Sequence, residues 1–71
     1  MYISIEQTKR LLCGNYLFNA FGFSLLVTRL KRKYSDSPDE LTLQSCTKEL
    51  NEFLANHKGI IEADLIIMAK I

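Results

Sequence analysis

The stretch that decides the fold runs from Tyr16 to Tyr34 and reads YLFNAFGFSLLVTRLKRKY. At 3.6 residues per turn its apolar side chains recur every three or four positions and form one stripe, made of Tyr16, Ala20, Phe23, Val27, Leu30 and Tyr34. A second apolar row follows about 100° further round the helix and contains Leu17, Phe21 and Leu25. The spacing predicts one long helix over Tyr16–Tyr34, and neighbouring segments must cover its N-terminal half on most sides.

A shorter helix is expected before this stretch, from Ile5 to Cys13. Ser4 followed by Gln7 is typical of a capping box, in which each side chain bonds the backbone N–H of the other residue. Gly14 then predicts an end to this helix in a left-handed conformation. Asn15 is placed to cap the long helix that follows.

A third helix is predicted after the turn SDSP at residues 35–38. Ser37 is expected to cap it, with Pro38 at the first helical position and Glu40 completing a capping box. Its end is expected at Gly59. One face gathers Leu43, Cys46, Leu50, Phe53, Leu54 and His57. The side expected to face water carries Thr42, Gln44, Lys48, Glu49, Asn51 and Glu52.

The segment at residues 60–71 fits two structures. Its alanine, methionine and leucine content favours a short fourth helix, while residues 65–71 also suit a strand paired with residues 2–5. We expect an all-α fold, a small three- to four-helix bundle with short antiparallel connections, formed by residues 1–71 as one domain. Its predicted core contains Leu12, Leu17, Phe21, Phe23, Val27, Leu30, Leu50, Phe53, Leu54 and Leu65.

Size and composition carry most of the functional prediction. A chain of 71 residues has little interior, yet 48% of its residues are apolar. Some of those side chains are therefore expected on the surface, where an apolar patch commonly marks a contact with a partner or a second subunit. The net charge of +1 gives no overall attraction to nucleic acid or to an anionic membrane.

The two cysteines, Cys13 and Cys46, are too few for a secreted disulfide scaffold. The start of the sequence also lacks the pattern of a secretory signal, so we expect a cytoplasmic protein with reduced thiols. A bridge between the two cysteines stays open at this point. No membrane span is expected in residues 11–27, because four residues interrupt the apolar run, namely Asn15, Asn19, Gly22 and Ser24.

Motifs for catalysis, cofactors or metal are not recognisable in the sequence. His57 is the only histidine, no Cys-x-x-Cys pair is present, and the three glycines are too far apart to form a phosphate-binding loop. The sequence therefore predicts a protein that is not an enzyme and that holds no metal and no cofactor.

Residues 47–51, with the sequence TKELN, resemble the Ser-x-x-Leu-Asp signature of the small two-helix aspartyl-phosphate phosphatases of sporulating bacteria. The resemblance covers five residues of one helix and implies dephosphorylation of a response-regulator receiver domain. The sequence departs from the signature at both functional positions. Thr47 stands in place of the serine, and Asn51, which has no carboxylate, stands in place of the acidic residue.

The resulting prediction is a non-enzymatic regulatory protein, an adaptor or inhibitor, that binds another protein through an apolar helix face and forms a homodimer. Its expected contact residues lie off the main apolar stripes and are Phe18, Leu26, Ile66, Ile67 and Met68. The size also suits a phage or mobile-element accessory protein. The alternative is nucleic-acid binding through the basic run Arg29, Lys31, Arg32 and Lys33, although cations at the end of a helix usually complement its dipole.

Overall fold

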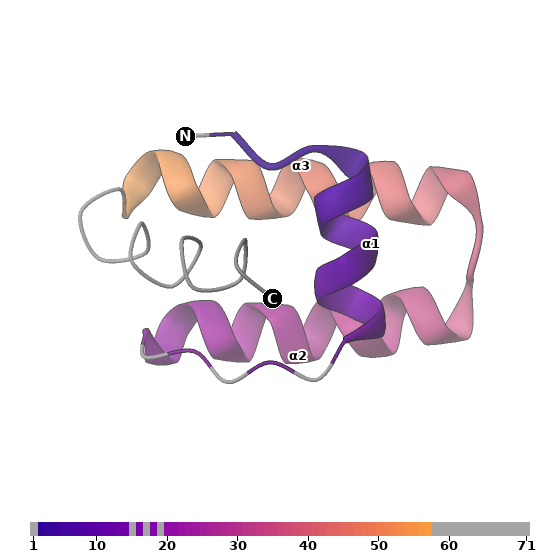
Figure 1. The fold of residues 1–71 in the computed structure, drawn as a ribbon, viewed down its shortest axis with the longest axis horizontal. Coiled ribbons are helices and arrows are strands. Elements are labelled where there is room, and N and C mark those ends of the chain that lie inside the picture. The colour runs from indigo at the N-terminus through magenta and orange to yellow at the C-terminus, as the bar shows by residue number, and fades with distance from the viewer. Residues whose placement is uncertain (1, 15, 17, 19, 58–71) are drawn as a thin grey trace.

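The computed structural model of this chain describes residues 2–14, 16, 18 and 20–57. This part of the chain forms three α-helices and no strand: α1 (Ile5–Cys13), α2 (Phe21–Asp36) and α3 (Glu40–Asn56). Helices α2 and α3 lie side by side and α1 lies across them, so that each helix contacts the other two (Figure 1). The all-α prediction is confirmed for these residues. The predicted fourth helix, and its strand alternative, lie outside the described residues.

Helix α1 has the predicted bounds and the predicted capping box. The Ser4 hydroxyl accepts a hydrogen bond from the Gln7 N–H at 3.1 Å, and the Gln7 side chain accepts one from the Ser4 N–H at 2.9 Å. The predicted left-handed end is wrong, because Gly14 has φ −93° and is extended. A close approach explains the glycine instead: a Cβ atom there would lie 2.8 Å from the Arg10 carbonyl oxygen and collide with the Tyr16 ring.

Helix α2 begins at Phe21 with Ala20 as its N-cap, so the predicted start at Tyr16 with a cap at Asn15 is wrong. Aromatic packing gives the physical reason. The Phe18 ring meets the Phe23 ring edge to face, with 4.9 Å between centroids. Five positions apart on one helix, these side chains would point in different directions, and the non-helical backbone at residues 18 and 20 allows the contact.

The connection between α2 and α3 also differs from the prediction. Ser37 ends α2, because its N–H donates to the Lys33 carbonyl at 3.2 Å. Asp39 is the N-cap of α3, and its carboxylate accepts from the Thr42 N–H at 2.8 Å. Pro38 accounts for the end of α2, since it disfavours helical backbone at Ser37. Helix α3 ends at Asn56, and the predicted stop at residue 59 lies outside the described residues.

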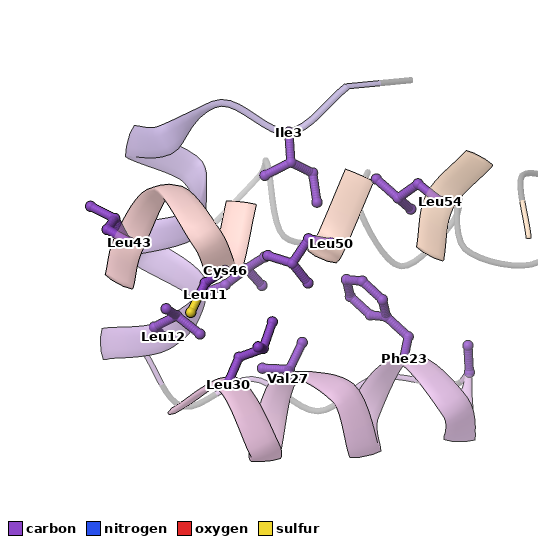
Figure 2. Close-up of a cluster of buried hydrophobic side chains, with 11 residues drawn as sticks. Ile3, Leu11, Leu12, Phe23, Val27, Leu30, Leu43, Cys46, Leu50 and Leu54 are labelled. Atoms are coloured by element: carbon purple, nitrogen blue, oxygen red, sulfur yellow. The ribbon is translucent and has the colours of Figure 1, made fainter. Parts of the chain in front are cut away.

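The core lies between the three helices, and Figure 2 shows Phe23 directed from α2 toward Leu50 and Leu54 of α3. The buried apolar residues are Ile3, Leu11, Leu12, Ala20, Phe23, Val27, Leu30, Leu43, Cys46, Leu50 and Leu54. Burial is confirmed for the predicted core residues Leu12, Phe23, Val27, Leu30, Leu50 and Leu54. Phe53 is half-buried against this core.

Phe21 is the one described residue of the predicted core that the structure places outside it. Two positions along a helix correspond to a rotation of about 200°. Once Phe23 points inward, Phe21 must therefore point outward. The remaining predicted core residues, Leu17 and Leu65, lie outside the described residues.

Candidate functional site

An exposed apolar surface follows the side of α2 that faces away from the core. Phe21 is 76% exposed and Leu25, one turn later, is 55% exposed. Thr28 and Arg32 continue the same line along the helix and are also exposed. We call these four residues the outer row of α2. Arg32 has no ion-pair partner among the described residues, so the row is apolar at one end and cationic at the other.

The outer row confirms the expectation of surface apolar side chains, but it does not contain the residues expected to bind a partner. Phe18 and Leu26 are half-buried and pack against the core. The other three, Ile66, Ile67 and Met68, lie outside the described residues. The signal for the outer row was present in the sequence as the second apolar row of the Tyr16–Tyr34 stretch, which was expected to be covered.

The four residues of the basic run point in different directions around α2. Arg29 and Lys33 face α3, where their side-chain nitrogens lie 2.9 and 3.3 Å from the two carboxylate oxygens of Glu49. Lys33 also donates to the Ser45 hydroxyl at 3.0 Å. Lys31 is half-buried, and Arg32 belongs to the outer row. Two of the four cations are thus already paired within the fold.

The charge on Glu49 is stabilised by these two neighbours. Partial burial raises the pKa of Glu49, but hydrogen bonds from Arg29 and Lys33 outweigh that effect and hold the pKa below its ordinary value. Glu49 is therefore ionised near neutral pH and joins α2 to α3 at their solvent-exposed edge.

A groove of about 520 Å³ is the second open surface, between the N-terminal segment and α3. Its lining residues are Tyr2, Ile5, Gln44, Thr47, Lys48, Asn51, Glu52 and Ala55. Tyr2 is 74% exposed and Ile5 is 38% exposed, so two apolar side chains stand beside it. Sequence reasoning missed the groove, because it depends on the N-terminal residues lying along α3, a contact that helical periodicity does not reveal (Figure 1).

Asn51 holds the N-terminal segment in this position. Its side-chain oxygen accepts from the Ile3 N–H at 2.7 Å, and its side-chain nitrogen donates to the Ile3 carbonyl at 3.0 Å. The amide thus satisfies both backbone groups of Ile3, as a neighbouring strand would. The expectation that Asn51 faces water is wrong, because the side chain is half-buried and its nitrogen also donates to the Thr47 carbonyl at 3.1 Å.

A buried hydroxyl pair joins α1 to α3 close by. The hydroxyls of Thr8 and Thr47 lie 2.7 Å apart, and both residues are buried. The Thr8 hydroxyl also lies within hydrogen-bonding distance of the Ser4 carbonyl, one turn earlier in the chain. The Thr47 hydroxyl lies within hydrogen-bonding distance of the Leu43 carbonyl in the same way. Among the described residues no buried side-chain polar atom lacks a partner. Thr47 and Asn51, the two positions that matter in the phosphatase-like pentapeptide, are thus both engaged in internal contacts.

The two cysteines are free rather than bridged. Cys13 is exposed at the end of α1, and Cys46 is buried in the core. Burial raises the pKa of the Cys46 thiol, so it stays protonated near neutral pH and packs as a small apolar side chain. His57 lies at the end of α3, where its ring stacks on Phe53 at a centroid distance of 4.1 Å.

The described part of the chain contains no cluster of three or more histidine, cysteine or acidic side chains that could hold a metal ion. None of its helices is both long enough and apolar enough to cross a bilayer. Comparisons with protein families, with curated proteins and with solved structures found no match. Within the described residues, the candidate binding surfaces are the outer row of α2 and the groove beside α3.

Proposed function

We propose that this chain is a non-enzymatic regulatory protein that binds another protein through the outer row of α2. The exposure of Phe21 and Leu25 carries the proposal, because both lie one turn apart on a helix whose opposite side is buried in the core. Covering such side chains is favourable by about 1.5–3 kcal/mol each. A partner that covers both therefore gains several kcal/mol from two residues, which is typical of the anchors of a protein interface.

The chemistry of the partner follows from the two ends of the outer row. Phe21 and Leu25 require an apolar surface, and Arg32 lies about 10 Å beyond Leu25 along the helix axis, at about 1.5 Å per residue. A partner helix with apolar residues at one end and a carboxylate near the other would match both. The proposal includes a cytoplasmic location, which the two free cysteines support.

Substitution of the outer row tests this proposal. The double variant Phe21→Ser/Leu25→Ser should lose a partner that the wild-type protein retains from an extract of its native host, read by quantitative mass spectrometry. Leu41→Ser is the matched control, because Leu41 is 78% exposed but belongs to α3. The proposal fails if the double variant and the control retain the same proteins in the same amounts.

A second variant tests the cationic end of the row. Once a partner has been purified, Arg32→Glu should weaken its binding about tenfold, mainly through the loss of an opposite-charge contact. The effect should shrink as salt is added. Unchanged affinity of Arg32→Glu would remove the acidic feature from the description of the partner and leave only its apolar contact.

Nucleic-acid binding through the basic run is the second hypothesis. The ion pairs of Arg29 and Lys33 with Glu49 weigh against it, since phosphates would have to compete for two of the four cations. Retention on duplex DNA that falls steeply with salt would favour it, because phosphate binding releases counterions. Salt-insensitive capture of a protein by the wild type, lost in the Phe21→Ser/Leu25→Ser variant, would favour the first proposal.

A further inference from the structure

The groove side of α3 carries two opposite charges that have no ion-pair partner among the described residues. Lys48 and Glu52 both line the groove and both are exposed. They lie one turn apart, about 6 Å along the helix axis at 1.5 Å per residue. Their charges are opposite and their spacing is short, so a surface that pairs with both must present an acid and a base at the same spacing in the reverse order.

We propose that this side of α3 is a homodimer interface, in which a second copy of the chain packs its own α3 against the groove in the opposite direction. A two-fold axis would cross α3 at the level midway between Lys48 and Glu52. Lys48 of each copy then lies opposite Glu52 of the other, and the symmetry produces both ion pairs at once. A two-fold interface requires one patch that is complementary to itself, and these two residues meet that condition.

The other groove residues fit close helix packing. Ala55 and Gln44 lie on the same side of α3 as the two charges, and the buried Thr47 lies at the floor. Ala55 is a small side chain at one end of this face, and packed helices lie about 8–10 Å apart depending on the side chains between them. Tyr2 and Ile5 stand beside the groove, where a second copy would cover apolar surface that is now exposed.

A stable dimer would have to bury a sizeable share of the surface of so small a chain. Stable interfaces bury about 800 Å² on each partner. That area is about one-sixth of the 4831 Å² surface of one copy. This interface uses none of the outer-row residues of α2, so the dimer and the proposed partner binding can succeed or fail independently.

Charge reversal gives a decisive test. Lys48→Glu makes the patch wholly negative, and Glu52→Lys makes it wholly positive, so each variant places two like-charged pairs across the two-fold axis. We expect each variant alone to dimerise about tenfold more weakly than the wild type, or worse, in a dilution series measured by analytical ultracentrifugation. An equimolar mixture should form the heterodimer, because every pair across the axis is then attractive.

Heterodimer formation can be read by energy transfer between dyes attached to Cys13, which is the exposed cysteine. Arg32→Glu and Asp36→Lys form the matched control pair, since both residues are exposed and have the same spacing on α2. The control variants should dimerise like the wild type, and mixing them should bring no gain. Circular dichroism establishes that every variant is folded, which is expected for substitutions at exposed positions.

Three outcomes would overturn the proposal. A wild-type protein that remains monomeric throughout the dilution series has no such interface. If the wild type dimerises but the mixed Lys48→Glu and Glu52→Lys variants do not, the dimer uses another surface. If the control pair on α2 behaves in the same way as the pair on α3, the association depends on overall charge or on the outer row, which contains Arg32, rather than on this groove.

Discussion

Helix α3 is joined to its two neighbours by polar contacts of different kinds. Toward α1 and the N-terminal segment they are buried or half-buried and uncharged, from Thr47 to Thr8 and from Asn51 to Ile3. Toward α2 they are charged and exposed, from Glu49 to Arg29 and Lys33. Loss of a buried partner leaves a desolvated group unpaired, whereas water replaces a lost exposed ion pair. The uncharged contacts should therefore contribute more to stability than the charged ones.

The largest effect is expected for Asn51→Ala. This change leaves the N–H and the carbonyl of Ile3 without their partner and should lower the free energy of unfolding by about 2–3 kcal/mol. Urea denaturation measures the loss. Asn56→Ala is the control, because Asn56 makes only an exposed bond to the Glu52 carbonyl. Equal losses in the two variants would contradict the comparison.

The hydroxyl pair should show strong coupling. Thr8→Val and Thr47→Val are each expected to cost about 1–2 kcal/mol, because each leaves one buried hydroxyl with one partner fewer. The double variant should cost clearly less than the sum, since both hydroxyls are then absent. Thr28→Val provides the exposed reference, as its hydroxyl bonds only the Ser24 carbonyl. Additive losses in the double-mutant cycle would show that the two hydroxyls do not interact.

The charged contact should appear as a dependence of stability on pH. The pKa of Glu49 is lowered in the folded state, so its stabilisation is present above its ordinary pKa of 4.5 and is lost as pH falls through the folded-state value. Glu49→Gln should therefore reduce stability at pH 7 by less than about 1 kcal/mol and lose less than the wild type on acidification. The pKa of Asp39 is also lowered, by its hydrogen bond from Thr42. Asp39 is present in both the wild type and Glu49→Gln, so it does not contribute to the difference between them.

Salt should produce the smallest difference and separate the two kinds of contact. Added sodium chloride is expected to shrink the stability gap between wild type and Glu49→Gln, because exposed charges are screened. The gap between wild type and Asn51→Ala should stay nearly constant. Urea titrations at low and high salt provide the measurement. A gap for Asn51→Ala that closes with salt would place that contact in the same class as the ion pairs.

Separation along the chain, rather than charge, explains what could be predicted from the sequence. The bounds of α1 and its capping box follow from local signals within a few residues, and both were predicted. On α3 the predicted inward residues Leu43, Cys46, Leu50 and Leu54 are buried, whereas His57 is exposed and the buried Thr47 was missed. The contacts of Thr8 with Thr47 and of Ile3 with Asn51 span 39 and 48 positions, and both escaped prediction. Periodicity reports which side of a helix is apolar, but not which distant polar group will meet it.

The start of α2 shows a different limit. Residues 16–20 carry a helical pattern of apolar side chains, yet Ala20 is the N-cap and Phe18 packs on Phe23 from non-helical backbone. The packing of the Phe18 ring on the Phe23 ring outweighed the apolar repeat, which extends only about one turn before Phe21. The late start has no effect on which later residues face inward, so Val27 and Leu30 were predicted correctly. It does place Phe21 in the first turn of α2, with its ring exposed.

The contact between Asn51 and the backbone of Ile3 also has a consequence during synthesis. Ile3 leaves the ribosome 48 residues ahead of the side chain that binds its backbone N–H and carbonyl. Closing so long a loop costs entropy before the contact forms. The nascent chain therefore cannot complete this domain stepwise from its first helix, and the domain closes only once most of α3 has been translated.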